Sequence, residues 1–479
     1  MEIKLIRFLV YSIVFSCSIL LFLAINFEKI GNDSSTLLII GSDIAKGNYP
    51  YENFWDIKPP LIYYLVSLTF LSDNLLNSIL AYSTFLYIVS ACIFFTIARR
   101  VLFKHSVIPA TAIFLLSYQL FMNNEALITE QFLIIFLLLM AHQIIFSSSN
   151  LKWLGIGLLT CILGLTKTNF AALAILLPLY ILTFEPKNNR QKDLKLFIFG
   201  GLTALIVFLS FFYHSGEAFF IFLKTFFLAP FDSSGGSPAI NFLSFIKDVF
   251  TSSKILFFIP LFYFFLSYKE QDLVFKKFIF FGLLVLPIIL INIIRGPNDL
   301  YILPILFTLV ICLVKFVETI ANSSHAKNFL FLPIIISLSF TNLDLALQAK
   351  ENKVNFNLLN YIKNNLNAQD EIFIVSTRFH YLYLLLNKEP LSSMVHPSNF
   401  YSRESWLKFS PNVEDNHQDE LLRILLKYPK FIIIPKREFP EAFMYKLNSC
   451  WNSVNTELYY LGDASLMKLK TKCRITPTQ

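Results

Sequence analysis

Charged residues are scarce in this chain, and their scarcity excludes an ordinary soluble protein. Of its 479 residues, 15% are Asp, Glu, Lys or Arg, whereas 55% are hydrophobic and 53 are Phe. The mean hydropathy is +0.59. Soluble domains carry about 25% charged residues. The composition therefore indicates a membrane protein.

Cysteine is also scarce, and the metal motifs built from it are absent. The sequence has six Cys but neither a C-x-x-C nor an H-E-x-x-H pattern, so it offers no familiar zinc motif. Four cysteines lie in apolar stretches and are interpreted as small core residues: Cys17, Cys92, Cys161 and Cys312. Cys450 and Cys473 lie in the polar tail, where they can pair if the tail faces an oxidising compartment.

Long apolar stretches recur up to about residue 345, and each can cross a hydrocarbon core of roughly 30 Å. We predict a polytopic α-helical membrane protein with about eleven transmembrane helices. The first stretch is longer than a signal-peptide core and lacks an obvious small-residue cleavage site, so it is predicted to be a span. The predicted spans are 7–27, 77–98, 106–122, 129–146, 153–166, 169–184, 194–213, 254–268, 275–294, 300–320 and 328–345.

Basic residues alternate between the connections and predict the orientation. They cluster in four loops after even-numbered spans: "ARRVLFKH" (98–105), "EPKNNRQKDLK" (185–195), "YKEQDLVFKK" (268–277) and "HAKN" (325–328). The positive-inside rule then predicts a multi-pass protein of the cell (inner) membrane with a cytoplasmic N-terminus and an extracytoplasmic tail. This clustering explains the net charge of +8 without a nucleic-acid partner.

Two domains are predicted. Residues 1–345 form the transmembrane domain, whose long outer loop, 28–76, is acidic and aromatic and contains proline. Residues 346–479 form a small α/β domain with strands at 371–375 and 431–435 and a helix at 419–429.

Ionisable residues gather on the predicted outer side. The acids are Asp33, Glu52, Asp56, Glu125 and Glu130, and the bases are Lys58, Lys167 and Arg295. Any one of them can be only an interfacial anchor or a snorkelling side chain. The three bases, however, oppose the positive-inside bias, and Lys and Arg are the natural ligands of phosphate. They predict a site for an anionic group.

The stretch "NYPYENFWDIKPPLIYYL" (48–65) carries one of these bases. Pro is favoured at the start of a helix, so a helix is expected from the double proline onwards. That helix would place Lys58 beside backbone N–H groups that favour an anion. Alternatively, "PYENFWDIKPP" is only a stiff turn.

This stretch resembles the first outer loop of the GT-C glycosyltransferases of the protein O-mannosyltransferase and lipid A aminoarabinose transferase group. Weaker resemblances occur at "LITEQF" (127–132), "GLTKTNFAALAILLP" (164–178) and "NDLYILPIL" (298–306). The family implies a GT-C-like fold and transfer of a sugar from a polyprenyl-phosphate donor to an outer acceptor, which is an envelope lipid, glycan or protein.

Roles follow from the resemblance for several residues. It implies that Asp33 is the catalytic carboxylate and Glu130 the second-loop acid, that Lys58 and Lys167 hold the donor phosphate, and that Tyr301 lines the cavity. We add Arg295 to the phosphate ligands from its charge and position, and we expect Tyr51 and Trp55 of the same first-loop stretch to line the cavity.

The chain departs from the family at three places. Ser34 stands where a second acid is common, Thr36 and Leu37 replace basic and aromatic residues, and "ND" precedes the Tyr-Ile-Leu-Pro segment. Asp43 matches no family motif and is expected on a solvated helix face, although a misalignment would exchange it with Asp33.

The chemistry expected is an inverting transfer. Fixed cations would stabilise the leaving phosphate, and Asp33 would orient or deprotonate the acceptor. No D-x-D motif occurs, so we expect neither metal–nucleotide chemistry nor an obligatory metal or other cofactor. The alternatives are a transporter or flippase for a lipid-linked glycan, and a membrane scaffold whose tail binds a partner. No internal repeat of the kind common in transporters is visible.

Overall fold

The computed structural model describes residues 2–122, 125–147, 149, 151–212, 215–228, 260, 263–264, 271–295, 299–320, 324–348, 353–395, 410–414, 416–435, 447–454 and 464–470. They divide into two compact units. Unit 1 comprises Met1–Phe27, Leu76–His214 and Ser233–Asn352, and unit 2 comprises Glu28–Leu75, Ser215–Asp232 and Lys353–Gln479. The division follows contacts rather than sequence order, so the predicted domain boundary at residue 345 stays a prediction.

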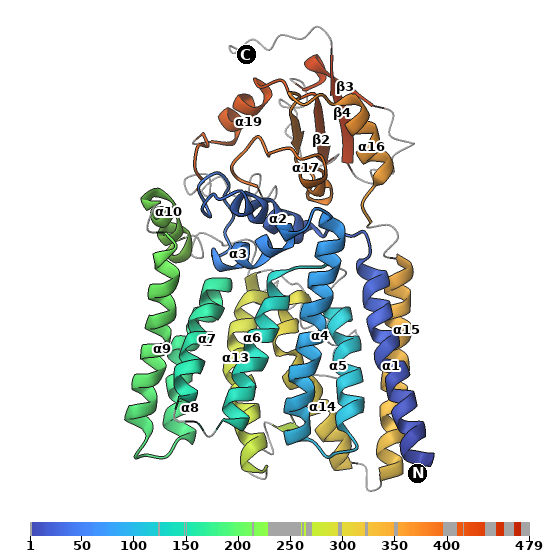
Figure 1. The fold of residues 1–479 in the computed structure, drawn as a ribbon, viewed down its shortest axis with the longest axis vertical. Helices are drawn as coiled ribbons and strands as arrows, with labels where there is room; N and C mark the ends of the chain where they lie inside the picture. Colours follow the sequence, from blue (N-terminus) through green and yellow to red (C-terminus); the bar gives the residue numbers. More distant parts are fainter. Residues whose placement is uncertain are drawn as a thin grey trace. The chain divides into compact units, whose positions relative to one another are not determined.

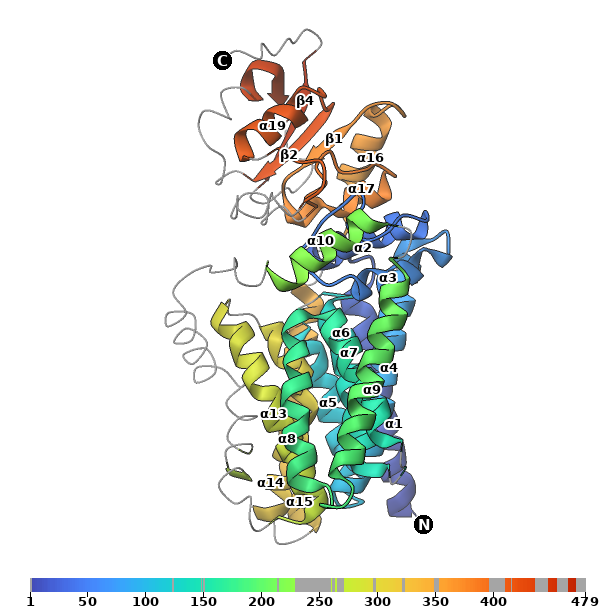
Figure 2. The ribbon, with the colours of Figure 1, turned by 90° about the vertical axis from the view of Figure 1, so that its left-hand side faces the viewer.

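Unit 1 is built from apolar helices that run side by side along one direction (Figures 1 and 2). Its helices are α1 (Glu2–Asn26), α4 (Leu75–Val101), α5 (Val107–Phe121), α6 (Thr129–Phe146), α7 (Lys152–Thr166), η2 (Thr168–Ala172), α8 (Leu173–Phe184), α9 (Arg190–Ser210), α13 (Leu273–Arg295), η4 (Asp299–Ile305), α14 (Leu306–Ile320) and α15 (Ser324–Gln348).

Helices occur at most of the predicted spans. Ten of the eleven predicted spans coincide with described helices, whereas nearly all of 254–268 lies outside the described residues. Within the described part of the chain, five helical segments are long and apolar enough to cross a membrane: Leu75–Val101, Thr129–Phe146, Arg190–Ser210, Leu273–Ile291 and Tyr301–Ile320. The total number of crossings stays a prediction.

Close helix packing in unit 1 depends on glycine. α7 and α9 lie side by side (Figure 2). A Cβ atom on Gly157 would lie 2.0 Å from the carbonyl oxygen of Phe197, and one on Gly200 would lie 2.2 Å from that of Leu154. Only glycine allows the two backbones to approach this closely, as small residues do between membrane helices.

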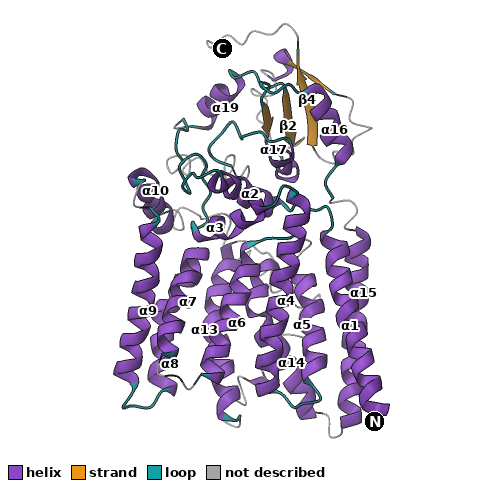
Figure 3. Cartoon of the chain, viewed as in Figure 1, coloured by secondary structure: helices purple, strands orange, loops and turns teal. Residues whose placement is uncertain are grey.

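Unit 2 combines the predicted outer loop with the tail. Its helices are α2 (Asn32–Ala45), α3 (Leu61–Ser67), η1 (Leu68–Leu71), α10 (Gly216–Phe227), α16 (Phe356–Asn365), η6 (Thr377–Phe379), α17 (Tyr381–Leu385) and α19 (His417–Leu425). Its strands are β1 (Ile372–Ile374), β2 (Phe431–Pro435), β3 (Trp451–Ser453) and β4 (Ala464–Leu469). Figure 3 shows the strands among the tail helices.

The strands form one mixed sheet in the order β1-β2-β4-β3. β1 and β2 are parallel, with Ile372 opposite Phe431, whereas β4 runs antiparallel to both β2 and β3. Both predicted strands and the predicted helix are therefore confirmed. Cys450 is disulfide-bonded, but Cys473 lies outside the described residues, so their pairing stays a prediction.

Candidate functional site

Three residues from separate sequence motifs meet in unit 1. Glu130 lies in the first turn of α6, Lys167 lies between α7 and η2, and Tyr301 lies in η4. The Lys167 Nζ atom donates a hydrogen bond to Glu130 Oε1 at 2.5 Å and lies 4.4 Å from the centroid of the Tyr301 ring. The Glu130 side chain is only 8% exposed. An ammonium group has three N–H donors, so the hydrogen bond to Glu130 does not use all the donors of Lys167.

The backbone just before Glu130 has a left-handed residue and is held by side-chain hydrogen bonds. Leu127 has a φ of 54°, in the left-handed region, which costs a non-glycine residue roughly 1–3 kcal/mol. The Leu127 N–H donates to Gln131 Oε1 at 2.6 Å, and Gln131 Nε2 in turn donates to Ser83 Oγ at 3.1 Å. These bonds fix the turn that presents Glu130.

A second lysine–acid pair lies in unit 2. Lys58 Nζ donates to Asp56 Oδ2 at 2.9 Å, and Asp56 is only 1% exposed. The Lys58 carbonyl oxygen accepts hydrogen bonds from the Tyr51 hydroxyl at 2.6 Å and the Tyr63 hydroxyl at 3.0 Å. The lysine is therefore held at its backbone as well as at its ammonium group.

The predicted helix after the double proline is confirmed, because α3 begins at Leu61 directly after Pro60. The anion-favouring role of its first turn stays a prediction. Asp56, which had no assigned role, is the partner of Lys58. The only signal in the sequence was that the two residues lie two positions apart.

Tyr51 and Trp55 are both fully buried. Burial, with a further contribution from the charge of Asp56, raises the pKa of Tyr51 well above its usual value, so its hydroxyl stays a neutral donor. Trp55 donates its indole N–H to Thr225 Oγ1 at 2.9 Å. The expectation that these two residues line a cavity stays a prediction.

Asp33 and Asp43 lie at opposite ends of α2. Asp33 is partly exposed in the first turn, where the helix dipole favours a negative charge. The expectation that Asp43 lies on a solvated face is wrong, because Asp43 is 3% exposed. Its Oδ1 accepts hydrogen bonds from Asn48 at 2.7 Å and Asn53 at 3.2 Å, and burial raises its pKa. The hydrophobic pattern of the sequence did not predict this burial. Asp43 is reached by Asn48 and Asn53 from the chain that follows α2.

Two other basic residues, Lys29 and Arg295, lie near the ends of predicted spans. Lys29, which sequence reasoning did not single out, is 4% exposed and lies four residues before Asp33. Arg295 ends α13, but its side chain lies outside the described residues. In the described part of the chain, no three His, Cys, Asp or Glu residues group as metal ligands, and the need for a metal stays untested.

Comparison with known proteins shows structural but not sequence similarity. No family model and no curated protein matches the chain. ArnT from Cupriavidus metallidurans in the apo state matches with a TM-score of 0.62 and 12% identity, over 95% of this chain and 97% of that chain. The same protein bound to undecaprenyl phosphate matches with a TM-score of 0.61, the same identity and the same coverage.

A more distant match is the archaeal oligosaccharyltransferase AglB from Archaeoglobus fulgidus, in complex with an inhibitory peptide and a dolichol-phosphate. It has a TM-score of 0.52 and 10% identity, over 91% of this chain and 71% of that chain. Identities this low show the fold alone. The chain therefore has the GT-C-like fold of these membrane proteins, as the sequence resemblance predicted.

Proposed function

We propose that the protein is a membrane glycosyltransferase that moves a sugar from a polyprenyl-phosphate donor to an envelope lipid, glycan or protein acceptor. One observation carries the proposal. Glu130, Lys167 and Tyr301 resemble three separate motifs of one transferase family, and they meet in one cluster within a GT-C-like fold. The undecaprenyl phosphate bound to ArnT and the dolichol-phosphate bound to AglB support a polyprenyl-phosphate donor.

In the proposed reaction, the acceptor oxygen attacks the anomeric carbon opposite the departing phosphate, so the configuration inverts. The new bond joins acceptor oxygen to sugar carbon, and the bond from that carbon to the phosphate oxygen breaks. Asp33 takes the acceptor proton. Lys58, Lys167 and Arg295 stabilise the charge that develops on the phosphate, and Glu130 keeps Lys167 in place.

The proposed orientation puts the N-terminus in the cytoplasm and residues 346–479 outside it. The alternating basic loops support this orientation, and so does the disulfide bond of Cys450, since disulfides persist in oxidising compartments. A reporter active only outside the cytoplasm should give a signal when fused after residue 479. No reporter signal after residue 479, together with a signal from a fusion near residue 190, would show that the orientation is the reverse.

Reconstituted vesicles test the reaction itself. The purified protein is given a polyprenyl-phosphate sugar with a radiolabel in the sugar, together with an envelope extract. We expect the label to appear in a new covalent product and polyprenyl phosphate to be released. Movement of intact donor across the bilayer would instead indicate a flippase. If neither transfer nor translocation is observed, both functions are refuted.

A further inference from the structure

A segment of the tail, residues 391–395, runs along Trp55 inside unit 2. The Trp55 N–H donates to the Ser393 carbonyl oxygen at 2.6 Å, and the Val395 N–H donates to the Trp55 carbonyl oxygen at 3.2 Å. Trp55 and Met394 thereby form a parallel bridge. Two chain regions more than three hundred residues apart thus share a short piece of β-structure.

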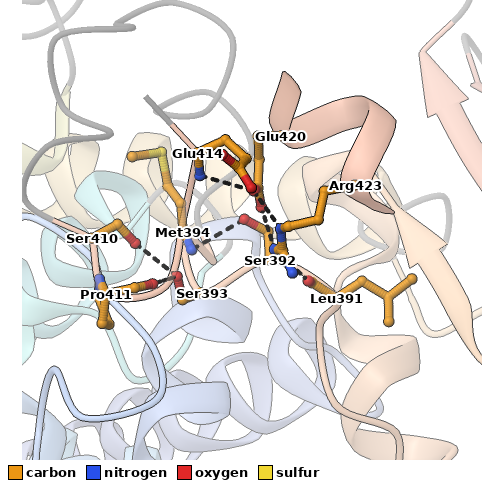
Figure 4. A network of polar contacts seen from close by, with 9 residues as sticks. All are labelled: Leu391, Ser392, Ser393, Met394, Ser410, Pro411, Glu414, Glu420 and Arg423. Carbon is orange, nitrogen blue, oxygen red and sulfur yellow. Dashed lines mark hydrogen bonds and ion pairs between the residues drawn. The ribbon is translucent and has the colours of Figure 1, made fainter. Parts of the chain in front are cut away.

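An ion pair on α19 with a buried acid holds this segment. Glu420 is fully buried, and Arg423 donates to both its oxygens, from Nε at 2.7 Å and from Nη2 at 2.6 Å. The same Nη2 atom donates to the Leu391 carbonyl oxygen at 3.2 Å. Figure 4 shows the pair lying against residues 391–394. A forked guanidinium suits this task because its donors have fixed directions.

Further bonds hold the segment from its other side (Figure 4). Ser393 Oγ contacts Ser410 Oγ at 3.0 Å and donates to the Pro411 carbonyl oxygen. The Glu414 N–H donates to Glu420 Oε2 at 3.2 Å, which joins this loop to the ion pair. Residues 391–395, which we call the strip, are therefore held next to Trp55 through both backbone and side chains.

Trp55 directly precedes the residues that hold Lys58. Asp56, the next residue, accepts the hydrogen bond from Lys58 Nζ, and its carbonyl oxygen accepts one from the Tyr63 hydroxyl at 3.3 Å. A shift of the Trp55 carbonyl group also moves the backbone N–H of Asp56, because both groups belong to one planar peptide unit. The placement of the Lys58 ammonium group thus depends on the strip.

We propose that Arg423 and Glu420 are positioning residues for Lys58, which they hold in place through residues 391–395 and Trp55. The inference rests on the proposed function in one respect, namely that Lys58 binds the donor phosphate. It assigns the tail a part in donor binding, although Arg423 and Glu420 themselves do not belong to the phosphate site.

Amide hydrogen exchange on the full-length protein in nanodiscs tests the connection without relying on activity. The variant is Glu420→Gln with Arg423→Gln, which removes both charges and leaves no unpaired buried ion. We expect exchange in peptides covering residues 53–58 to accelerate by up to about tenfold, since the lost bonds are each modest. Ser393→Ala is the second variant and decides the question if the first does not fold.

The control is Lys430→Met, which removes another ion pair of the tail, that between Lys430 and Asp370. It should leave exchange at residues 53–58 unchanged. In transfer assays, the first variant should raise the KM for donor several-fold with kcat unchanged. Unchanged exchange at 53–58 in the first variant, or in Ser393→Ala if the first variant does not fold, would overturn the proposal. Normal donor use by Lys58→Ala would instead refute the proposed phosphate role of Lys58 and leave the exchange result standing.

Discussion

Lys167 in unit 1 and Lys58 in unit 2 are each paired with a buried acid, but they are held in different ways. The Lys167 ammonium group meets the Glu130 carboxylate and the Tyr301 ring, both from distant elements. Lys58 is paired with an acid only two residues away, and its carbonyl oxygen is held by Tyr51 and Tyr63. The contacts described for Lys167 are therefore on its ammonium group, whereas Lys58 is held at its backbone as well.

This difference predicts how each lysine responds to change. Substitution of one neighbouring side chain removes a contact of the Lys167 ammonium group. The Lys58 backbone accepts hydrogen bonds from two tyrosines, so it should tolerate the loss of one of them. Lys167 should be sensitive to its direct neighbours. Lys58 should be sensitive to whatever moves the chain from Trp55 to Lys58.

The largest expected effect belongs to neither lysine. Asp33→Asn removes the proposed base and leaves both lysine–acid pairs in place. A general base contributes about 10²–10⁴ in rate, so kcat should fall by about that factor while the KM for donor changes little. Kinetics with a polyprenyl-phosphate sugar at matched protein level measure this.

The matched control is Asp73→Asn, an exposed acid of the same predicted outer loop. It should retain wild-type turnover, because it removes loop charge without touching the proposed site. Near-normal transfer by Asp33→Asn would remove Asp33 from the mechanism and leave the lysine clusters without an assigned base.

The two lysines come next. Lys58→Ala and Lys167→Ala should each weaken donor use by about 1.5–3 kcal/mol, the value of a hydrogen bond to a charged group. Lys167→Ala should also lower the free energy of unfolding, because it strands the buried Glu130 carboxylate. Lys167→Met combined with Glu130→Gln avoids that loss and should still bind donor poorly.

Arginine substitution sharpens the comparison. Neither Lys58→Arg nor Lys167→Arg should restore full donor use, because a planar guanidinium differs in shape from an ammonium group. Normal donor kinetics in both alanine variants would refute the assignment of a phosphate site to these residues.

The sequence predicted the helices well and the contacts poorly. Apolar runs and the double proline specify helices locally, which is why α3 and the helices at ten of the predicted spans were predicted correctly. The pairing of Lys167 with Glu130 joins residues 37 positions apart. The charge pattern and the family resemblance both pointed to these residues, but neither predicted that they pair. The burial of Asp43 and the bridge between Trp55 and Met394 arise from tertiary packing, which hydrophobic periodicity does not encode.

Asp43 gives a smaller effect that tests the loop around Lys58. Asp43→Ala leaves the amides of Asn48 and Asn53 without their shared acceptor, so we expect a loss of about 1–3 kcal/mol in the free energy of unfolding of unit 2. Thermal unfolding in detergent measures this. A kcat loss as large as that of Asp33→Asn, with unchanged stability, would show that the catalytic aspartate had been misassigned.

Tyr301→Leu tests the contact between the Lys167 ammonium group and an aromatic ring. It removes the ring beside the ammonium group and should weaken donor binding by about 0.5–2 kcal/mol, the range of cation–π interactions. Binding of polyprenyl phosphate measures this directly. Tyr301→Phe is the control and should be close to wild type, because the ring remains. Equal losses in both variants would mean that the hydroxyl, not the ring, is what matters.

The smallest effect concerns an ion pair that serves neither lysine. Burial alone would raise the pKa of Asp370, but the hydrogen bond and charge of Lys430, at 2.6 Å, lower it below its usual value. An acid with a lowered folded-state pKa adds stability above its unfolded pKa of about 3.9, and that stability is lost as the pH falls through the folded-state value.

Asp370→Asn should therefore reduce the free energy of unfolding of unit 2 by about 0.2–1 kcal/mol at pH 7, because the pair is partly exposed to water. The difference from wild type should shrink as the pH falls below about 4. Hydrogen exchange of β2 at several pH values measures both. Transfer and exchange at residues 53–58 should stay unchanged, since this pair does not touch the strip that holds Trp55. A pH-independent difference would contradict the ion-pair explanation, and a loss of donor binding would show that the tail influences Lys58 by a route other than Arg423.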